Sequence, residues 1–177
     1  GYDIEFLPDG NTLITTKSGD IIRYNDDFEL VGKINIKRPG LLGLSVDPNF
    51  EENNYIYVFY TYAIYGKESD ALTLQRVSRF SLKNFTLSDE KILLEDIPGS
   101  PSHYGGRLKI SPNGKLFATT GDANRPMQVQ NLSFLGGKIL RINLDGSVPV
   151  GNPFSNSYVY SYGHRNPQGL AWNPKTG

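Results

Sequence analysis

The sequence predicts an all-β protein, and among all-β folds a β-propeller. Its composition favours strands and turns, with 19 glycines and 11 prolines beside 11 tyrosines and 9 phenylalanines in 177 residues. One phrase also recurs along the chain: an apolar strand, a turn centred on proline and a second apolar strand. Repeated antiparallel units at intervals of roughly 40 to 60 residues are typical of propeller blades. A β-sandwich also has many short strands, but it does not require the repeated phrase.

The first repeat predicts three strands, at 4–7, 12–16 and 21–24. The tripeptide Pro8-Asp9-Gly10 separates the first two of them. Aspartate and glycine tolerate positive φ angles, so this tripeptide favours a tight hairpin turn. We therefore expect the chain to open with an antiparallel sheet.

The later repeats follow the same plan, with turns at Pro48, Pro112 and Pro174. The expected strands are 44–46 and 55–60 in the second repeat, 108–111 and 116–120 in the third, and 170–172 in the fourth. Only 70–79 could be read as a helix, and its β-branched and aromatic surroundings favour a strand. The fourth repeat stops at its turn, and an open propeller leaves unpaired edges. We therefore expect the chain to be part of a longer protein.

The charge and residue counts exclude several classes of function. Eighteen basic and eighteen acidic residues give a net charge of zero, so no nucleic-acid or anionic-membrane surface is predicted. No apolar run approaches the roughly 18 residues of a membrane helix. The chain has no cysteine and only two histidines, which excludes thiolate chemistry and a polyhistidine metal centre.

A loop near the end of the sequence concentrates polar side chains between two glycines. Arg165, Asn166 and Gln168 lie within four positions, around Pro167. Arginine offers a planar fork to carboxylates, and Asn and Gln offer donors and acceptors, so the loop suits a flat, charged ligand. A polar turn between strands is the other interpretation of the same residues.

A second polar cluster precedes and follows the third repeat. His103 stands just before a Gly-Gly pair and a strand, and Asp122 follows the next strand. Antiparallel pairing of 108–111 with 116–120 would bring both ends of this hairpin to one rim. Asp122 can then orient the imidazole of His103, which can act as a general base near neutral pH. The alternative is a surface histidine beside an unrelated turn residue.

Five phrases of the sequence resemble one known family. They are 40–44 with 47–50 (GLLGL and DPNF), 103–108 (HYGGRL), 120–122 (TGD), 136–147 (GGKILRINLDGS) and 163–169 (GHRNPQG). In this order they are similar to phrases of the soluble pyrroloquinoline-quinone (PQQ)-dependent sugar dehydrogenases, the glucose/sorbosone dehydrogenase family. The likeness is greatest to the aldose sugar dehydrogenase branch, and it covers essentially the whole chain.

The resemblance implies a six-bladed propeller, of which residues 1–177 would form the N-terminal three blades of a single domain. It implies oxidation of an aldose at its anomeric carbon to a lactone, with hydride transfer to PQQ. His103 matches the general base, and Asp122 matches the acid that hydrogen-bonds it. Arg165 and Asn166 match residues that hold the quinone, and Gln168 lies in the same loop.

The family's remaining cofactor contacts, including the backbone oxygens that hold Ca²⁺, come from its second half. We therefore expect no metal ligand in this chain, and neither tight cofactor binding nor turnover from residues 1–177 alone. The resemblance further implies an external electron acceptor, a possible homodimer and a periplasmic or extracellular location.

The sequence departs from the family pattern at two positions. Arg38 stands where glucose-dehydrogenase members carry a polar acceptor near the active centre, and we assign it no role. Ser102 precedes the histidine where some glucose-specific members have an acid, which favours the broader aldose class.

Two other functions are compatible with a propeller. One is a non-catalytic binding module, because propellers often serve as recognition scaffolds. The other is a Ca²⁺-dependent lactonase, which would need a carboxylate-rich centre that these loops do not offer. Retention of His103 together with Arg165 and Asn166 favours the quinone enzyme.

Overall fold

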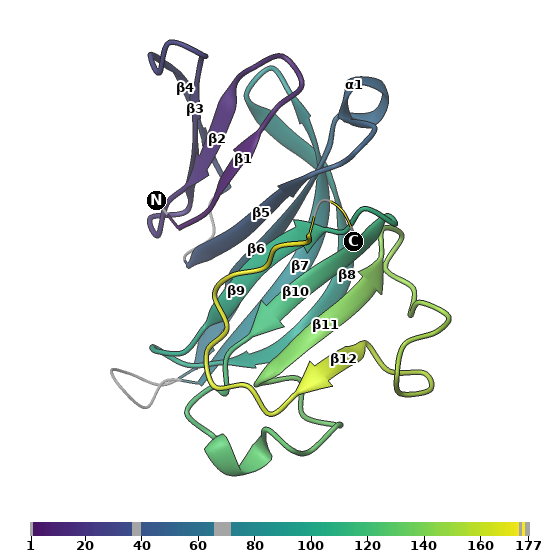
Figure 1. The fold of residues 1–177 in the computed structure, drawn as a ribbon. Coiled ribbons are helices and arrows are strands. Elements are labelled where there is room, and N and C mark those ends of the chain that lie inside the picture. The colour runs from purple at the N-terminus through teal and green to yellow at the C-terminus, as the bar shows by residue number, and fades with distance from the viewer. Residues whose placement is uncertain (1, 37–39, 66–71, 174, 176–177) are drawn as a thin grey trace.

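The protein is described by a computed structural model that covers residues 2–36, 40–65, 72–173 and 175 (Figure 1). The described chain forms three antiparallel sheets of four strands, and strands that are neighbours in a sheet are consecutive in the sequence. The three sheets follow one another as blades, and the first strands of adjacent blades contact each other. This arrangement confirms the predicted all-β propeller architecture and its three blades.

Each blade uses one continuous stretch of the chain. The first contains β1 (Ile4–Phe6), β2 (Thr12–Thr15), β3 (Asp20–Tyr24) and β4 (Leu30–Asn35). The second contains β5 (Leu41–Val46), β6 (Tyr55–Tyr65), β7 (Leu72–Lys83) and β8 (Thr86–Gly99). The third contains β9 (Gly105–Ile110), β10 (Lys115–Thr120), β11 (Lys138–Asn143) and β12 (Val159–Tyr162).

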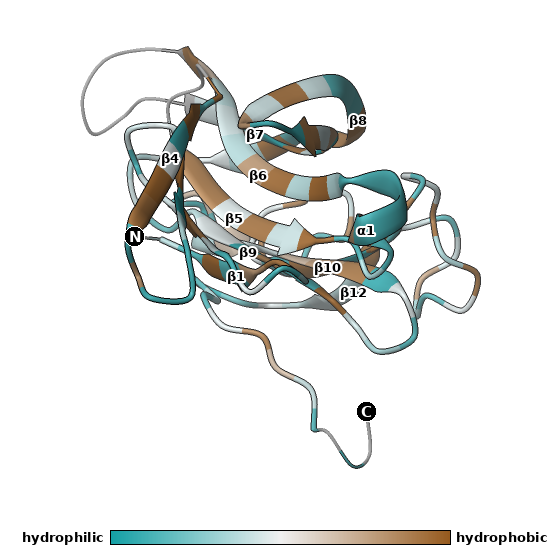
Figure 2. Cartoon of the chain, turned by 90° about the horizontal axis from the view of Figure 1, so that it is seen from above, coloured by the Kyte–Doolittle hydropathy of each residue, from teal (hydrophilic) through white to brown (hydrophobic). Residues whose placement is uncertain are grey.

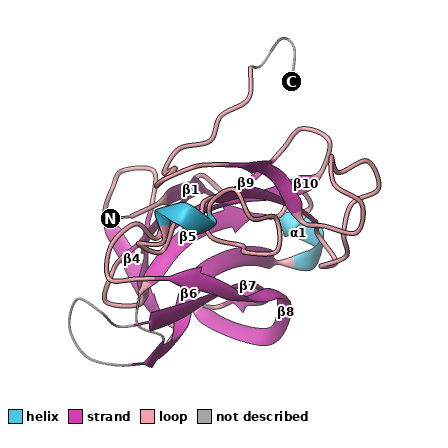
Figure 3. Ribbon diagram, turned by 90° about the horizontal axis from the view of Figure 1, so that it is seen from below, coloured by secondary structure: helices cyan, strands magenta, loops and turns pink. Residues whose placement is uncertain are grey.

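The predicted strands of the first three repeats are confirmed, and β4, β8, β11 and β12 complete the blades. The preference for strand over helix at 70–79 is confirmed from Leu72 onward, because 70 and 71 lie outside the described residues. The sequence did not reveal two short helices, α1 (Phe50–Asn53) and the 3₁₀ turn η2 (Pro126–Gln128), which Figure 3 shows as the helical segments among strands and loops.

The strand predicted at 170–172 is wrong. No described residue after Tyr162 belongs to a strand, and Figure 3 draws this part of the chain as a loop. The physical reason is that no described strand lies beside it to share a hydrogen-bond ladder. The turn expected at Pro174 and the position of Arg38 lie outside the described residues.

The second blade is buried on both faces, which explains the continuous apolar run in β6. Tyr57 and Phe59 pack in the core shared with the third blade. Ile56, Val58 and Tyr60 point the other way, into the core shared with the first blade. Successive side chains of a strand alternate between its faces, so a strand between two cores has to be apolar throughout. In Figure 2, β5 is accordingly mostly brown and β6 alternates between brown and pale bands, whereas α1 at the edge is mostly teal.

The chain after β12 runs back along the innermost strand of its own blade (Figure 1). Two contacts fix it there: the backbone N–H of Gly105 donates to Asn166 Oδ1, and Arg107 Nε donates to the carbonyl of Gln168, both at 2.9 Å. This path brings the loop that carries Arg165 to the rim where β9 begins and β10 ends. In the described part of the chain, no helix has the length and apolar character to cross a membrane.

Candidate active site

The β9–β10 hairpin brings His103 and Asp122 together, as its expected pairing requires. Leu108 lies opposite Ala118, and Gly105 lies opposite Thr120 after a shift in register. The residues just outside this ladder therefore share one rim. His103 Nδ1 lies 2.9 Å from Asp122 Oδ1. The second blade supplies the loop that carries His103 to this rim, since β8 ends at Gly99.

The backbone around His103 is held by close contacts with the opposite strand end. A Cβ atom on Gly121 would lie 1.5 Å from the carbonyl oxygen of His103, so only glycine fits there. His103 itself adopts a φ of +57°, a left-handed conformation that disfavours a side chain. Such conformations persist only where the surrounding structure enforces them, and they cluster at functional sites.

Asp122 is 3% exposed and serves as an acceptor at the centre of this corner. Its Oδ1 also accepts the backbone N–H of Asn124 at 3.0 Å. An ionised carboxylate can only accept hydrogen bonds, which assigns the shared proton to His103 Nδ1. The other ring nitrogen, Nε2, is then the basic atom, and it has no hydrogen-bond partner among the described residues. The imidazole can therefore accept a proton at Nε2 and share the resulting charge with Asp122.

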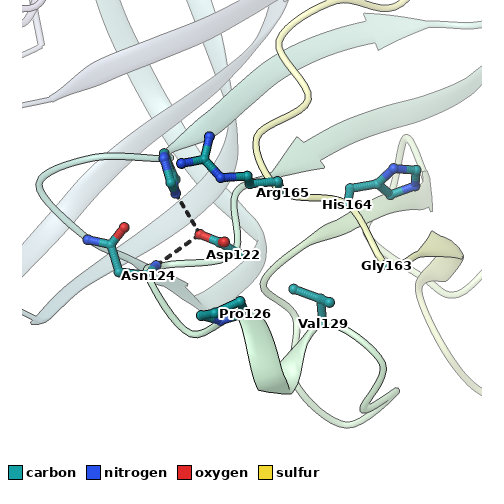
Figure 4. Close-up of a pocket in the computed structure, with 8 residues that line it drawn as sticks. Asp122, Asn124, Pro126, Val129, Gly163, His164 and Arg165 are labelled. Atoms are coloured by element: carbon teal, nitrogen blue, oxygen red, sulfur yellow. Dashed lines mark hydrogen bonds and ion pairs between the residues drawn. The ribbon is translucent and has the colours of Figure 1, made fainter.

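The loop after β12 supplies the opposite wall. The backbone N–H of Asp122 donates to the carbonyl of Arg165 at 2.8 Å, which ties the two loops together by main chain. Figure 4 shows the Arg165 side chain on the same side of the pocket as Asp122, with the ring of His164 turned the other way. Within the described residues, no carboxylate forms an ion pair with the Arg165 guanidinium. That guanidinium is accordingly available to an anionic ligand.

These walls enclose a cavity of about 310 Å³, at the small end of the usual range for ligand pockets (Figure 4). Its lining comprises His103, Asp122, Asn124, Pro126, Val129, Gly163, His164 and Arg165. Three of the five residues singled out in the sequence therefore line one cavity. Asn166 and Gln168 do not line it. The side-chain oxygen of Asn166 and the carbonyl of Gln168 are instead used to anchor the loop to the third blade.

Several residues of this site were not found from the sequence. Asn124 Oδ1 accepts a hydrogen bond from Ser102 Oγ at 3.1 Å, a contact that joins the two loops beside the histidine; the sequence had indicated Ser102 only as a departure from the family pattern. His164 lies in the same loop as Arg165, but only its neighbours Arg165, Asn166 and Gln168 were predicted from the sequence to bind a ligand. Lys138 follows the Gly136-Gly137 pair, and a lysine in alternation with the apolar residues Leu140 and Ile142 was the available signal. It is fully buried behind the cavity wall.

The Arg165 guanidinium gives the cavity a group that attracts a negatively charged ligand. The lining also contains one acidic residue, Asp122, and two histidines. Burial, and secondarily the neighbouring Lys138 ammonium, lower the pKa of His164 and so favour its neutral ring at pH 7. His164 Nε2 lies 2.8 Å from Ser161 Oγ, which fixes the orientation of that ring.

The chemistry of this donor set fits PQQ, because a flat acid finds an arginine fork on one wall and a basic imidazole on the other. The same lining residues include one carboxylate, Asp122, and so offer no carboxylate-rich site for Ca²⁺. No group of three or more His, Asp or Glu side chains that could hold a metal occurs among the described residues.

Comparison with known proteins places this architecture in a family. Residues 1–177 match the model described as Glucose / Sorbosone dehydrogenase. The chain belongs to the glucose/sorbosone dehydrogenase family. This match and the family phrases agree over the whole sequence.

Three relatives illustrate the range of the family. The chain is 34% identical to quinoprotein glucose dehydrogenase B of Acinetobacter calcoaceticus, over 94% of this chain and 42% of that protein. It superposes on the PQQ-bound aldose sugar dehydrogenase of Streptomyces coelicolor with a TM-score of 0.85 and 32% identity, over 98% of this chain and 53% of that structure. It is also 30% identical to human Hedgehog-interacting protein, over 90% of this chain and 26% of that protein. The chain thus spans about half the length, or less, of these relatives.

Proposed function

We propose that the protein containing this chain is a quinone-dependent aldose dehydrogenase, with residues 1–177 forming the N-terminal half of one propeller domain. The observation that carries the proposal is the 2.9 Å contact between His103 and Asp122 on the wall of a cavity that also holds Arg165. A PQQ-bound structural relative and a relative named as a quinoprotein support the choice of cofactor.

In this proposal, different residues of this chain transfer the proton and bind the quinone. His103 Nε2 takes the proton of the anomeric hydroxyl, and Asp122 stabilises the imidazolium that forms. The quinone, when bound, accepts the hydride that leaves the anomeric carbon, so the sugar loses two electrons and one further proton and becomes a lactone. Arg165 binds a carboxylate of the quinone and sets its position relative to His103. An external acceptor then takes the electrons.

The other predicted residues have supporting roles in this proposal. Asn166 holds the Arg165 loop through its bond to Gly105 and can present its amide N–H₂ to the quinone. Gln168 anchors the loop through its carbonyl. Any Ca²⁺ bound with the quinone would take its ligands from outside the described residues.

The proposal is tested by titrating the full-length apoprotein with PQQ and Ca²⁺, followed by an aldose and an artificial electron acceptor. Saturable quinone binding with sugar-dependent reduction of the acceptor is expected. A full-length protein that binds no PQQ would refute the proposal.

A binding module is the second candidate, and the likeness to Hedgehog-interacting protein is the observation that favours it. In that case the rim loops would contact a protein partner in place of a quinone. Absence of PQQ binding by a correctly folded full-length protein is the result expected for this alternative.

A further inference from the structure

Lys138 is a buried ammonium group at the start of β11. Its side chain is fully buried, with a relative exposure of 0%. Its Nζ donates to the carbonyls of Val129 and Gly136, at 2.9 and 2.7 Å. The ring of Phe134 lies 5.8 Å from the same nitrogen, measured to the ring centroid. All these contacts come from the segment between β10 and β11.

This ammonium has no carboxylate partner within the described residues. Its two acceptors are neutral carbonyls, although a buried charge is normally paired. Burial accordingly lowers the pKa of Lys138 to about 8. The group still carries most of its charge at pH 7. An unpaired cation kept in the interior calls for a negative charge nearby at some stage of function.

The nearest place for that negative charge is the candidate site. Val129, whose carbonyl accepts from Lys138, lines the cavity. The Lys138 ammonium also lowers the pKa of His164, another lining residue. The backbone N–H of Lys138 donates to Thr120 Oγ1, two residues before Asp122. The ammonium therefore lies directly behind the wall formed by Val129 and His164.

We propose that Lys138 is a positioning residue for the anionic ligand of this cavity. Its buried charge adds to the attraction of Arg165 for an acid, and its two hydrogen bonds hold the Val129 wall in place. The inference rests on the proposed function, because it takes PQQ, a tricarboxylic acid, as that ligand. If Lys138 had a purely structural role, its replacement would weaken the binding of a charged ligand and of a neutral ligand of the same shape equally.

The test compares PQQ with its neutral trimethyl ester, using the full-length apoprotein and equilibrium binding followed by ligand absorbance or calorimetry. Lys138→Met removes the charge at similar length, and Lys115→Met removes a charge of β10 that bonds Asn143, outside the cavity lining. We expect Lys138→Met to raise the Kd of PQQ about 10-fold, because a buried positive charge behind the cavity wall is lost, and to change the Kd of the ester by less than about 2-fold. Lys115→Met should change neither.

Equal losses for acid and ester, or no loss for either, would overturn the inference while wild-type binding keeps the proposed function intact. Wild-type protein that binds neither ligand would refute the proposed function itself. If Lys138→Met does not fold, the wild-type preference for acid over ester is compared at about pH 7 and about pH 9.5.

At the higher pH, Lys138 has lost its proton, so the preference should shrink about as much as in the variant. Among the described residues, the other titratable groups next to Lys138 are His164, whose lowered pKa keeps it neutral at both pH values, and the cross-strand neighbour Tyr162. Repeating the measurement in Tyr162→Phe removes the tyrosine's contribution. An unchanged preference would overturn the inference.

Discussion

The two loops that form the cavity are held in different ways. The His103 loop is fixed at the side chain itself, by a buried carboxylate, a left-handed backbone and a glycine that permits backbone contact. The Arg165 loop is fixed through its main chain and through Asn166, which leaves the arginine head unpaired among the described residues. One loop is organised before any ligand arrives, as proton transfer requires. The other presents a charge whose partner would be the ligand.

The largest effect should follow from removing the base. His103→Gln in the full-length protein should lower kcat by about 10² or more, the usual contribution of a general base. Steady-state assays with a saturating aldose measure this change. The affinity for PQQ, followed by titration of the apoprotein, should change little because the arginine loop is intact. Unaltered kcat would remove His103 from the mechanism.

Asp122→Asn should have the next largest effect, because it keeps the shape of the corner and removes its charge. The amide can no longer stabilise the imidazolium, so kcat should fall about 10- to 100-fold. A folded Asp122→Asn variant with unchanged kcat would show that Asp122 has no part in the reaction.

Arg165→Ala changes the second of the two loops and should affect quinone binding. Loss of a charge-assisted, bidentate contact is expected to raise the Kd of PQQ about 10- to 100-fold, with the KM of the aldose nearly unchanged once quinone is saturating. Arg23→Ala is the matched control, because it removes an arginine that forms an ion pair with Asp9 in the first blade and does not line the cavity. Reconstitution by quinone at wild-type concentrations would contradict the role of Arg165.

The difference between the His103 loop and the Arg165 loop also explains how much of the site could be predicted. The hairpin register follows from the alternation of β9 and β10, so the meeting of His103 and Asp122 could be derived from the sequence. The position of Asn166 could not, because its oxygen is used by a backbone N–H of a strand 61 residues earlier. The buried state of Lys138 was equally hidden, since it depends on carbonyls of an irregular segment. Irregular segments have no periodicity from which side-chain directions can be read.

The three blades could be predicted because their strands show a regular alternation of side chains. The same kind of pattern at 170–172 could not be excluded as a strand. A strand pattern states which residues suit a sheet, but a sheet also needs a neighbour to share its hydrogen bonds. Trp172 instead packs edge-on against Phe117 of the third blade, with ring centroids 5.4 Å apart. Side-chain packing without a ladder leaves this segment extended beside the blade.

The smallest effect concerns the stability contributed by the Arg165 loop. The pKa of His164 is lowered in the folded protein, first by burial and then by Lys138. The unfolded chain therefore binds a proton more readily below its ordinary pKa of about 6.5, so folding stability is lost as the pH falls through that region. Thermal melts between about pH 8 and about pH 5 should show a smaller decline of Tm for His164→Gln than for the wild type. Parallel declines in the two proteins would mean that His164 does not couple to folding, and that the loop is held by its main chain alone.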